Sequence, residues 1–586
     1  MYVVSTAGHV DHGKSTLINA LTGIDPDRLS EEHRRGLTIE LGFAWLTLPS
    51  GREVGIVDVP GHERFIKNML AGVGSINAAI FVVAANEGWK PQSQEHLEIL
   101  DLLGVRSAVV ALTKIDSIDP TEQPAVEARI RKHLLGTCLE EAPIVGVSAT
   151  TNTGLAELRL AIDAILLTTL PPPDDDRPRL WIDRVFTMKG AGTVVTGTLT
   201  GGSLRKDEVI ETLPNGIKAR IRSLQTHRRE VDAIGPGNRV ALNLVGVEND
   251  RLERGHTIVA PTSWEVVGRL LADVRFLPSF DTKSKGAFKF YVGSAASDAK
   301  LRISDDGLSL ITLQDPLPLV FGDRFILRES GRRQTIGGGR VIETKAPFQN
   351  GASRAAATTK LEYLGVLLGE GQILPMKGLE ARLGLSIEKA RTLEAVWLGS
   401  FVLSESTLAS IASQTTEVLE RFHRVSPLEP GMMRSALNVE QDILEELLRR
   451  EIIVSRSGYI TMPSHKVQTQ GPEQTALLEY LEASGASPNT LPELHTTFDP
   501  GLIRSMIRSG SLVQISDQLV YTAHWIEDLK KIVAKQVTNQ GPFTVADFRD
   551  MIKTTRKYAI PLLEYLDSLG FTVRSGDKRT LRSPEP

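Results

Sequence analysis

The amino-acid sequence predicts a multidomain chain. An α/β phosphate-loop domain comes first, then two β-barrel domains, then tandem winged-helix domains that are mainly α-helical. Three observations predict this order. The chain has 586 residues, too many for one hydrophobic core. A glycine-rich loop motif opens a region in which strand-like and helical segments alternate. Short, glycine-punctuated strands follow from about residue 180, and helical patterns return beyond about residue 350.

The overall composition excludes several classes of protein. Hydrophobic residues make up 41% of the chain and charged residues 24%, and no apolar run approaches the roughly 20 residues that span a bilayer. The single cysteine, Cys138, excludes an intrachain disulfide framework. We therefore expect a cytoplasmic protein without a secretory signal. Because the net charge is −4, any contact with nucleic acid must come from a local basic patch.

The stretch AGHVDHGKST contains the phosphate-loop pattern G-x-x-x-x-G-K-[ST] between an apolar strand and a periodic helix. Its glycines let backbone N–H groups face phosphate oxygens, Lys14 reaches the terminal phosphates, and the Ser15 hydroxyl suits a magnesium ion. The pattern predicts a bound nucleoside triphosphate. The residues expected to hold it are Gly8, His9, Val10, Asp11, His12, Gly13, Lys14, Ser15 and Thr16.

A second motif, GIVDVPGHERF, is an apolar strand that ends in an acidic residue followed by a glycine. Asp58 can hold the magnesium ion through water, and the Gly61 N–H can sense the γ-phosphate. This motif predicts the end of the site where the phosphate bond is broken.

Two further strand ends indicate which base is bound. SAVVALTKID ends in Lys114, which can lie along the base, and Asp116, which can accept hydrogen bonds from guanine N1–H and N2–H₂. IVGVSAT ends in Ser148 and Ala149, whose backbone N–H groups can meet guanine O6. With the first two motifs, they predict a GTP-binding, GTP-hydrolysing domain at residues 1–170, built on a parallel sheet covered by helices.

The forms GHVDHGKST, RGLTIE and DVPGH are those of translational GTPases, and this domain resembles the G domain of the elongation factor Tu type. The resemblance implies that Thr38 closes on the magnesium ion and the γ-phosphate in the GTP state. It implies that His62 positions the attacking water and is the catalytic residue. It also implies a first switch at residues 24–42 and a second at 58–75.

The guanine motif departs from the usual Asn-Lys-x-Asp because Thr113 replaces the asparagine. We expect guanine specificity to persist through Asp116. We also expect weaker affinity for GDP, which would let the chain exchange nucleotide without a separate exchange factor.

A stiff, charged linker, LPPPDDDRPR, separates this domain from two predicted β-barrels at residues 180–262 and 263–345. The segment IDRVFTMKGAGTVVTGTL resembles the second domain of the same translational family, and GDRFILRESGRRQTIGGGRVIE resembles the end of its third domain. In that family the G domain and both barrels clamp an aminoacyl-tRNA in the GTP state.

A weak repeat follows. The segments EIIVSRSGYITM, SLVQISDQLVYT and GFTVRSGDKRTL begin 60 and 59 residues apart, and each follows a helical pattern. A helix–turn–helix with a two-stranded wing fits this pattern. Any one unit can equally be a protein-packing module, and the first three can be a spacer. We predict winged helices at residues 350–410, 411–466, 470–525 and 526–586.

The last unit has a local charge of +4 between Arg549 and Arg582. Basic side chains at the start of its second helix can read a groove or bind phosphates, although a solvated charged face is the alternative. The residues expected to contact RNA are Arg549, Arg556, Lys557, Tyr558, Arg574, Lys578 and Arg579.

A tRNA-clamping GTPase core followed by tandem winged helices resembles the bacterial selenocysteine-specific elongation factor family, the SelB type, over the whole chain. The stretch FTVADFRD…TTRKYAIPLLEYLDSLGFTVRSGDKR carries its most specific part. The resemblance implies a GTP- and Mg²⁺-dependent, ribosome-stimulated GTPase that delivers selenocysteinyl-tRNA at an in-frame UGA codon. It implies that the last winged helix binds an mRNA hairpin beside that codon. We expect a monomer.

Selenocysteine chemistry predicts a cationic pocket, because a selenol is more acidic than a thiol and is a selenolate at neutral pH. Fixed cationic donors favour the selenolate over neutral serine. In the resembling family the pocket lies on the second domain, and the matching positions are Asp183, Arg184 and Arg239. A structural ion pair at the barrel rim is the alternative for Asp183 and Arg184.

Two other functions remain open from the sequence. The first is a general aminoacyl-tRNA or initiator-tRNA carrier with an appendage, which the long C-terminal extension disfavours. The second is a regulatory RNA-binding protein that uses its GTPase as a conformational switch.

Overall fold

The computed structural model of the chain divides into two units, Met1–Glu405 and Ser406–Pro586. The residues that the structure describes are 2–26, 38–62, 65, 68–70, 76, 78–188, 192–282, 286–304, 307–332, 334–346, 348, 351–427, 429–465 and 471–582.

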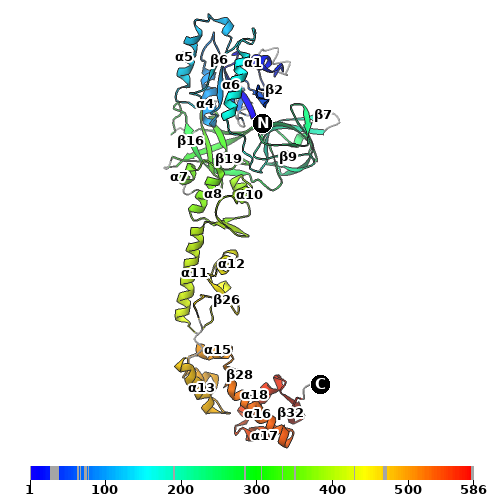
Figure 1. The fold of residues 1–586 in the computed structure, drawn as a ribbon, viewed down its shortest axis with the longest axis vertical. Coiled ribbons are helices and arrows are strands. Elements are labelled where there is room, and N and C mark those ends of the chain that lie inside the picture. The colour runs from blue at the N-terminus through cyan, green and yellow to red at the C-terminus, as the bar shows by residue number, and fades with distance from the viewer. Residues whose placement is uncertain are drawn as a thin grey trace. The chain divides into compact units, whose positions relative to one another are not determined.

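The first domain is built on a six-stranded sheet in the order β2-β3-β1-β4-β5-β6, in which β2 is antiparallel to β3 and the other pairs are parallel (Figure 1). Helices α1 and α6 contribute to the core on one face, and α4 and α5 to the core on the other. Both faces are therefore covered, and β4 is buried along its whole length, as expected for a doubly wound α/β domain. The elements are β1 (Tyr2–Gly8), α1 (Lys14–Thr22), β2 (Gly42–Thr47), β3 (Glu53–Asp58), β4 (Ala78–Ala84), α4 (Pro91–Leu103), β5 (Ala108–Thr113), η2 (Ile115–Ser117), α5 (Gln123–Leu134), β6 (Ile144–Gly146) and α6 (Leu155–Thr168).

The second domain is a β-barrel. Its strands run in the order β10-β15-β7-β8-β14-β11, and a further pairing of β10 with β11 closes the ring; β12 extends from β11. Alternating apolar residues fill its interior. The elements are β7 (Arg179–Met188), β8 (Gly192–Thr200), β9 (Leu204–Arg205), β10 (Val209–Leu213), β11 (Ile217–Thr226), β12 (Arg229–Val231), β13 (Ala233–Ile234), β14 (Asn238–Val245), η3 (Asn249–Arg251) and β15 (Thr257–Val259).

The third domain is a closed barrel in the order β16-β19-β18-β17-β20-β21. Its residue Ile326 is buried in the same apolar cluster as helix α4, so the barrel and the first domain share part of one core. The two barrels and the α/β domain confirm the predicted fold class. The strands are β16 (Val267–Phe276), β17 (Phe288–Val292), β18 (Ala295–Ile303), β19 (Ser309–Leu317), β20 (Arg324–Glu329) and β21 (Thr335–Glu343).

The segment after the second barrel packs onto that barrel within the first unit. Tyr363 stacks on Phe321 with ring centroids 4.2 Å apart. The buried carboxylate of Glu343 accepts hydrogen bonds from Arg354 at 2.8 Å and Arg382 at 2.6 Å. These contacts make the segment part of the core. Its elements are α7 (Gly351–Ala356), α8 (Lys360–Gly369), β22 (Leu374–Pro375), α9 (Leu379–Leu383), α10 (Ile387–Ala390), β23 (Val396–Trp397) and β24 (Phe401–Leu403).

The linker between the first domain and the first barrel also contacts this segment. Lys360 pairs with Asp175 at 2.5 Å, Lys389 pairs with Asp176 at 3.2 Å, and Arg177 pairs with Glu380 at 3.2 Å. The charges of the linker are therefore used in packing.

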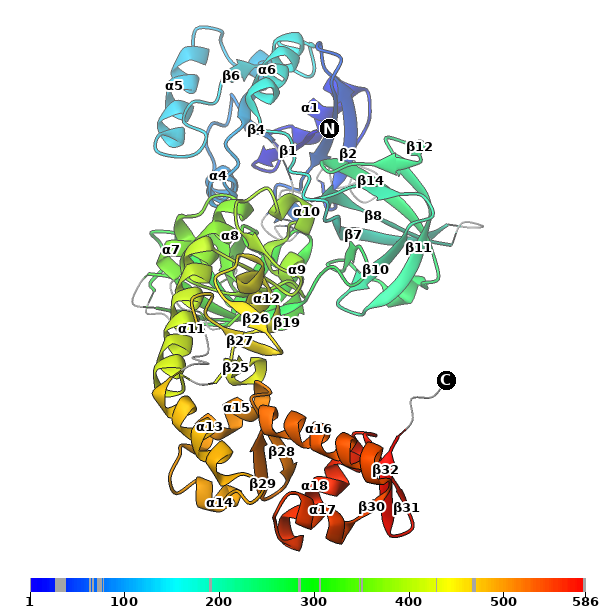
Figure 2. The same cartoon turned by 60° about the horizontal axis from the view of Figure 1, so that its bottom comes forward.

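The second unit contains helices and small antiparallel sheets (Figure 2). Each predicted wing hairpin is present, and two of them gain a third short strand, as in the orders β25-β27-β26 and β30-β32-β31. Helix α16 runs unbroken through residue 525, where the sequence pattern predicts a domain boundary, and Tyr521 shares a core with Phe543 and Phe548. The last two sub-domains thus pack as one body. The elements are α11 (Glu405–Val425), β25 (Met432–Met433), η4 (Arg434–Ala436), α12 (Gln441–Arg449), β26 (Val454–Arg456), β27 (Tyr459–Thr461), α13 (Pro472–Ser484), α14 (Leu491–Leu494), α15 (Pro500–Arg508), β28 (Leu512–Ser516), β29 (Leu519–Thr522), α16 (Ala523–Gln540), β30 (Phe543–Thr544), α17 (Val545–Met551), α18 (Arg556–Ser568), β31 (Thr572–Ser575) and β32 (Lys578–Leu581).

Among the helices of the described residues, none combines the length and the apolarity needed to cross a membrane.

The buried carboxylate yields a stability prediction. We expect Glu343→Gln to lower the free energy of unfolding of the first unit by about 3 kcal/mol, because the half-buried Arg382 would lose this carboxylate and the buried Arg354 would keep Glu370 alone of its two carboxylate partners. Glu265→Gln is the matched control: Glu265 pairs with Lys345 where both side chains are exposed, and such pairs contribute under about 1 kcal/mol. Denaturant titration of both variants measures the difference, and an equal destabilisation would contradict a structural role for the Glu343 cluster.

Candidate functional site

The phosphate loop connects β1 to α1 and is folded around its own lysine. Lys14 Nζ donates to the carbonyl oxygens of Gly8 at 3.1 Å and His9 at 2.7 Å. Gly8 has a φ of 132°, and a Cβ there would lie 2.2 Å from the carbonyl oxygen of Val82. Gly13, at the start of α1, has a φ of 83°. Glycine at both positions is what allows this tight turn.

Three oxygen-bearing side chains meet at the N-terminus of α1. Ser15 Oγ donates to Asp58 Oδ2 at 2.6 Å and lies 2.7 Å from Thr38 Oγ1. The Asp58 carboxylate is fully buried, and its Oδ1 accepts from Thr6 Oγ1 at 2.6 Å. Hydroxyl and carboxylate oxygens are the hard ligands that Mg²⁺ prefers, so the residues present fit that ion.

Gly61 lies against the phosphate loop. A Cβ on this residue would lie 2.5 Å from Lys14 Nζ and 2.6 Å from the backbone nitrogen of Val10, so only glycine fits. His62 follows it, half-buried, with its ring centroid 5.9 Å from that of Phe65. Much of the two expected switch segments lies outside the described residues.

The base end of the site is tied to the phosphate loop by Thr113, which stands in the asparagine position. Its buried hydroxyl donates to the carbonyl of His12 at 2.7 Å. Lys114 adopts a left-handed conformation and pairs with Glu87 at 3.1 Å, while Asp116 is exposed on η2. The Thr113 hydroxyl therefore links the base end of the nucleotide site to the phosphate loop.

Of the two amides expected to meet the base, the Ser148 N–H already donates to the Thr153 carbonyl at 3.0 Å. Contact of the Ser148 and Ala149 N–H groups with guanine stays a prediction, and Ala149 is half-buried beside Ser148. Thr16 is exposed on the outer side of α1, and Asp11 is exposed at the loop tip with a φ of 61°.

The second predicted site lies on β7 and β14 of the first barrel. Arg239 donates two hydrogen bonds to Asp183, at 2.5 and 2.9 Å, and a third to Thr196 at 3.1 Å. Arg184 donates to the Leu41 carbonyl at 2.5 Å and pairs with Glu40 at 3.2 Å. Each guanidinium therefore has a carboxylate partner in this structure.

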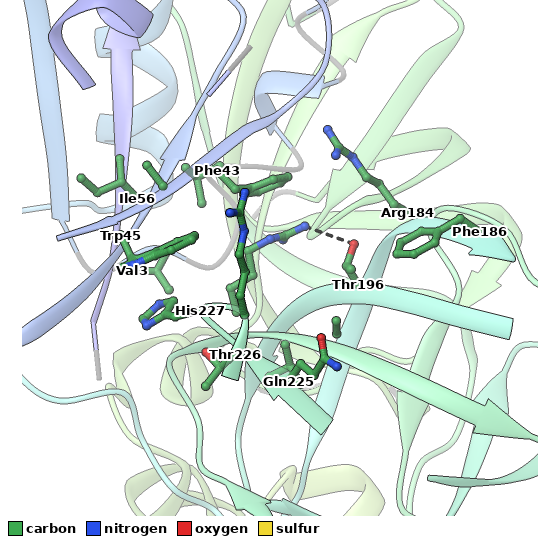
Figure 3. Close-up of a pocket in the computed structure, with 17 residues that line it drawn as sticks. Val3, Phe43, Trp45, Ile56, Arg184, Phe186, Thr196, Gln225, Thr226 and His227 are labelled. Carbon is green, nitrogen blue, oxygen red and sulfur yellow. Dashed lines mark hydrogen bonds between the residues drawn. The ribbon is translucent and has the colours of Figure 1, made fainter. Parts of the chain in front are cut away.

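Both arginines converge on one aromatic ring that the sequence reasoning missed. The guanidinium carbons of Arg239 and Arg184 lie 3.3 and 5.1 Å from the ring centroid of Phe43 on β2. All three line a cavity of about 230 Å³, whose walls also include Trp45 and His227 (Figure 3). Phe43 stands five residues after Thr38, and no local pattern could reveal its partners on a different domain.

A third cation lies near this pocket. Burial lowers the pKa of Arg254, while Asp183 and Glu40 act in the opposite direction. Arg254 also donates to Asn68 at 2.6 Å, so it connects the barrel to the first domain.

The third predicted site is at the start of α18 in the second unit. Arg556 and Lys557 are exposed in its first turn, and Lys557 Nζ lies 5.3 Å from the ring centroid of the half-buried Tyr558. Arg574 on β31 and Lys578 on β32 are also exposed. The start of the helix and the wing therefore present basic side chains to solvent.

The expectation for Arg579 is corrected by its surroundings. Its side chain is 5% exposed, and its Nε donates to Asp567 at 2.9 Å. A buried, paired guanidinium stabilises the wing against α18 and is not available to a phosphate. Arg549 pairs with its neighbour Asp550 at 2.6 Å and remains half-buried.

The fold and the first site define the chain as a translational GTPase. The elongation factor Tu GTP-binding domain family matches residues 1–168, the selenocysteine-specific elongation factor β-barrel domain matches 281–348, and the elongation factor SelB winged helix matches 535–581. Two similar relatives are selenocysteine-specific elongation factors. That of Desulfomicrobium baculatum is 35% identical over 99% of both chains. That of Escherichia coli is 32% identical over 99% of this chain and 98% of its own.

Solved structures agree with these relatives. A bacterial selenocysteine-specific elongation factor superposes with a TM-score of 0.67 at 27% identity, over 99% of this chain and all of the other. SelB from Methanococcus maripaludis, solved with a GTP analogue, superposes with a TM-score of 0.53 at 26% identity, over 59% of this chain and 80% of its own. The chain belongs to the selenocysteine-specific elongation factor family.

Proposed function

We propose that this chain is a GTP-dependent elongation factor that carries selenocysteinyl-tRNA to the ribosome at in-frame UGA codons. Its C-terminal winged helix binds an mRNA hairpin there. The observation that carries the proposal is the presence, in one chain matched over 99% of its length, of an elongation factor Tu-type G domain and a SelB-type winged helix. The protein acts as a cytoplasmic monomer.

GTP binds at the phosphate loop, with Lys14 leaving the loop carbonyls for the terminal phosphates. Ser15 and Thr38 would hold Mg²⁺ directly and Asp58 through water, and the ion would neutralise charge on the phosphates. Their hydroxyl and carboxylate groups already lie 2.6–2.7 Å apart, which supports this assignment. Asp116 and Lys114 bind guanine.

Thr113 supports the expected weak retention of GDP. Its hydroxyl makes the link to the phosphate loop with one short side chain. An asparagine has one additional donor for this network, and its donor and acceptor are on separate atoms. We infer that GDP leaves without a separate exchange factor.

The selenocysteinyl group enters the cavity beside Phe43. Arg184 and Arg239 attract the selenolate, and Asp183 fixes the orientation of Arg239 through two parallel hydrogen bonds. Serine carries no charge at neutral pH and gains little from these cations, so the pocket discriminates between two residues that differ by one atom.

The hairpin binds at the start of α18. There Arg556 and Lys557 contact phosphates, and Tyr558 packs beside them. Further positive charge comes from Arg549, Arg574 and Lys578. Holding the messenger near the decoding site raises the local concentration of the complex, by about 10²–10⁴ where the geometry permits. Codon recognition then triggers hydrolysis, with His62 positioning the water, and the tRNA is released.

Ester protection tests the function. With GTP bound, we expect the chain to slow hydrolysis of the aminoacyl ester on selenocysteinyl-tRNA, and not on the same tRNA carrying serine. Arg239→Gln should reduce the protection of the selenocysteinyl form by about tenfold or more, the usual range for removal of a charged hydrogen bond. Arg220→Gln, on an exposed pair with Asp207 of the same barrel, is the control.

Other results would change the assignment. Equal protection of the serine and selenocysteine forms would leave a tRNA carrier without an anion pocket. Protection of neither form would favour a regulatory RNA-binding protein.

The role of His62 is tested by His62→Ala. We expect GTP and tRNA binding to persist and ribosome-stimulated hydrolysis to fall by about 10²-fold or more, because the attacking water no longer has its positioning group. His524→Ala, an exposed histidine of the second unit, should have no effect. Unchanged turnover in single-round hydrolysis would rule out the assigned role.

The RNA surface is tested by the double variant Arg556→Ala and Lys557→Ala. We expect weaker hairpin binding, with GTP binding unchanged. On a plot of the logarithm of the hairpin association constant against the logarithm of salt concentration, the slope should become shallower by about 0.7–0.9 for each RNA phosphate that the variant no longer neutralises. Lys530→Ala with Lys531→Ala is the matched control, because these adjacent lysines pair with Glu527 and Asp528 on α16. Hairpin affinity left unchanged by the Arg556→Ala and Lys557→Ala variant would place the RNA surface elsewhere.

A further inference from the structure

Two side chains of helix α4 bind the backbone of the phosphate loop. The Gly8 N–H donates to His96 Nδ1 at 2.9 Å, and the Val10 N–H donates to Gln92 Oε1 at 3.0 Å. Gln92 and His96 are four residues apart, so they lie one turn apart on the same side of the helix. Two amides of the loop are thus fixed by the protein itself, independently of any nucleotide.

The histidine can make this contact because it is uncharged. His96 is 1% exposed, and its pKa is lowered to about 3, chiefly by burial and further by the charges of Lys14 and His9. Near neutral pH its Nδ1 therefore has a lone pair for the Gly8 N–H. A protonated imidazole has two donors and no acceptor, and would repel that N–H.

The same loop peptides also hold the phosphate-binding lysine. Lys14 Nζ donates to the carbonyls of Gly8 and His9, and the His9 carbonyl belongs to the same peptide group as the Val10 N–H that Gln92 accepts from. A rotation of these peptide planes moves both the lysine and the amides that follow in the loop. The position of α4 therefore bears directly on the groups expected to grip the phosphates.

Other residues of α4, Glu95 and Leu102, contact the second barrel. Glu95 Oε1 lies 3.3 Å from Arg328 Nη2 of β20, and the Arg328 side chain is 6% exposed. The Leu102 carbonyl accepts from Arg324 at 3.4 Å, and Ile326 is buried in the same cluster as Leu102. One rigid helix therefore contacts the phosphate loop and the barrel together.

We propose that α4 couples the second barrel to nucleotide release: Gln92 and His96 are positioning residues for the phosphate loop, and docking of the barrel through Glu95 and Arg328 keeps them in place. The proposal rests on the nucleotide site proposed above. It gives the chain a control of nucleotide exchange within its own core, since any movement of the barrel against α4 changes the hold on the loop.

Release of a fluorescent GDP, N-methylanthraniloyl-GDP, from the full chain tests the positioning role. We expect His96→Leu to speed release about tenfold, because a buried N–H is left without its acceptor. His96→Asn, whose Oδ1 is one bond from Cγ as Nδ1 is, should restore release to within about twofold of the unchanged chain. Gln92→Leu, at a half-buried position, is a second variant and should also speed release. Asparagine and leucine giving the same rate would overturn the role.

A double-mutant cycle tests the coupling. Glu95→Gln should speed release several-fold, whereas Glu98→Gln, whose carboxylate accepts from Gln94 at 3.1 Å on the same helix, should not. Combined with His96→Leu, Glu95→Gln should add less than it does alone, because part of its effect passes through the His96 contact and only the part through Gln92 remains. Independent, multiplicative effects would overturn the coupling.

The failures of the two proposals are distinguishable. Normal GDP binding with a release rate insensitive to His96→Leu, Gln92→Leu and Glu95→Gln would overturn the coupling alone. Absence of GDP binding by the unchanged chain would overturn the nucleotide site as well.

Discussion

The nucleotide-binding half of the molecule depends on one buried carboxylate. Asp58 has no exposure to solvent, and a buried ionised group is costly unless hydrogen bonds or a cation compensate it. Its oxygens accept from Thr6 on β1 and Ser15 on α1, and Ser15 in turn lies against Thr38. The need to compensate the Asp58 charge brings the phosphate loop, the sheet and Thr38 of the expected first switch together at one point. A divalent cation bound there would compensate that charge more strongly than the hydroxyl groups do.

The same physical requirement explains why the core of the chain extends beyond the second barrel. Glu343 is fully buried at the end of that barrel, and its partners Arg354 and Arg382 come from the segment that follows. Lys360 of the same segment is held by Asp175 of the linker. If this segment undocked from the barrel, the Glu343 carboxylate would lose the cations that compensate its burial, which is energetically unfavourable. The first of the predicted winged helices therefore belongs to the core.

Local signals in the sequence predicted the fold class and the phosphate loop, because Gly8, Lys14 and their neighbours act within one turn of chain. Signals that depend on tertiary packing were missed. Phe43 meets its two arginines from a different domain, and His96 looks like one more buried residue of an amphipathic helix until its Nδ1 is placed beside the loop. The count of basic residues in the last unit could not tell that Arg579 faces inward, because charge composition does not specify which side of a wing packs on the helix.

Only a few residues of chain separate the nucleotide site from the arginine pocket beside Phe43, so a movement in one site is transmitted to the other. Thr38 contacts Ser15 of the nucleotide site, Glu40 and Leu41 contact Arg184, and Phe43 contacts both pocket arginines. Five residues of extended backbone span at most about 18 Å, with no freely jointed segment between them. A shift of Thr38 must be absorbed within this stretch, and in the pocket proposed above Glu40 would compete with a selenolate for the guanidinium of Arg184. The segment would then make the affinity of that pocket depend on the contents of the nucleotide site, without a longer pathway through the domains.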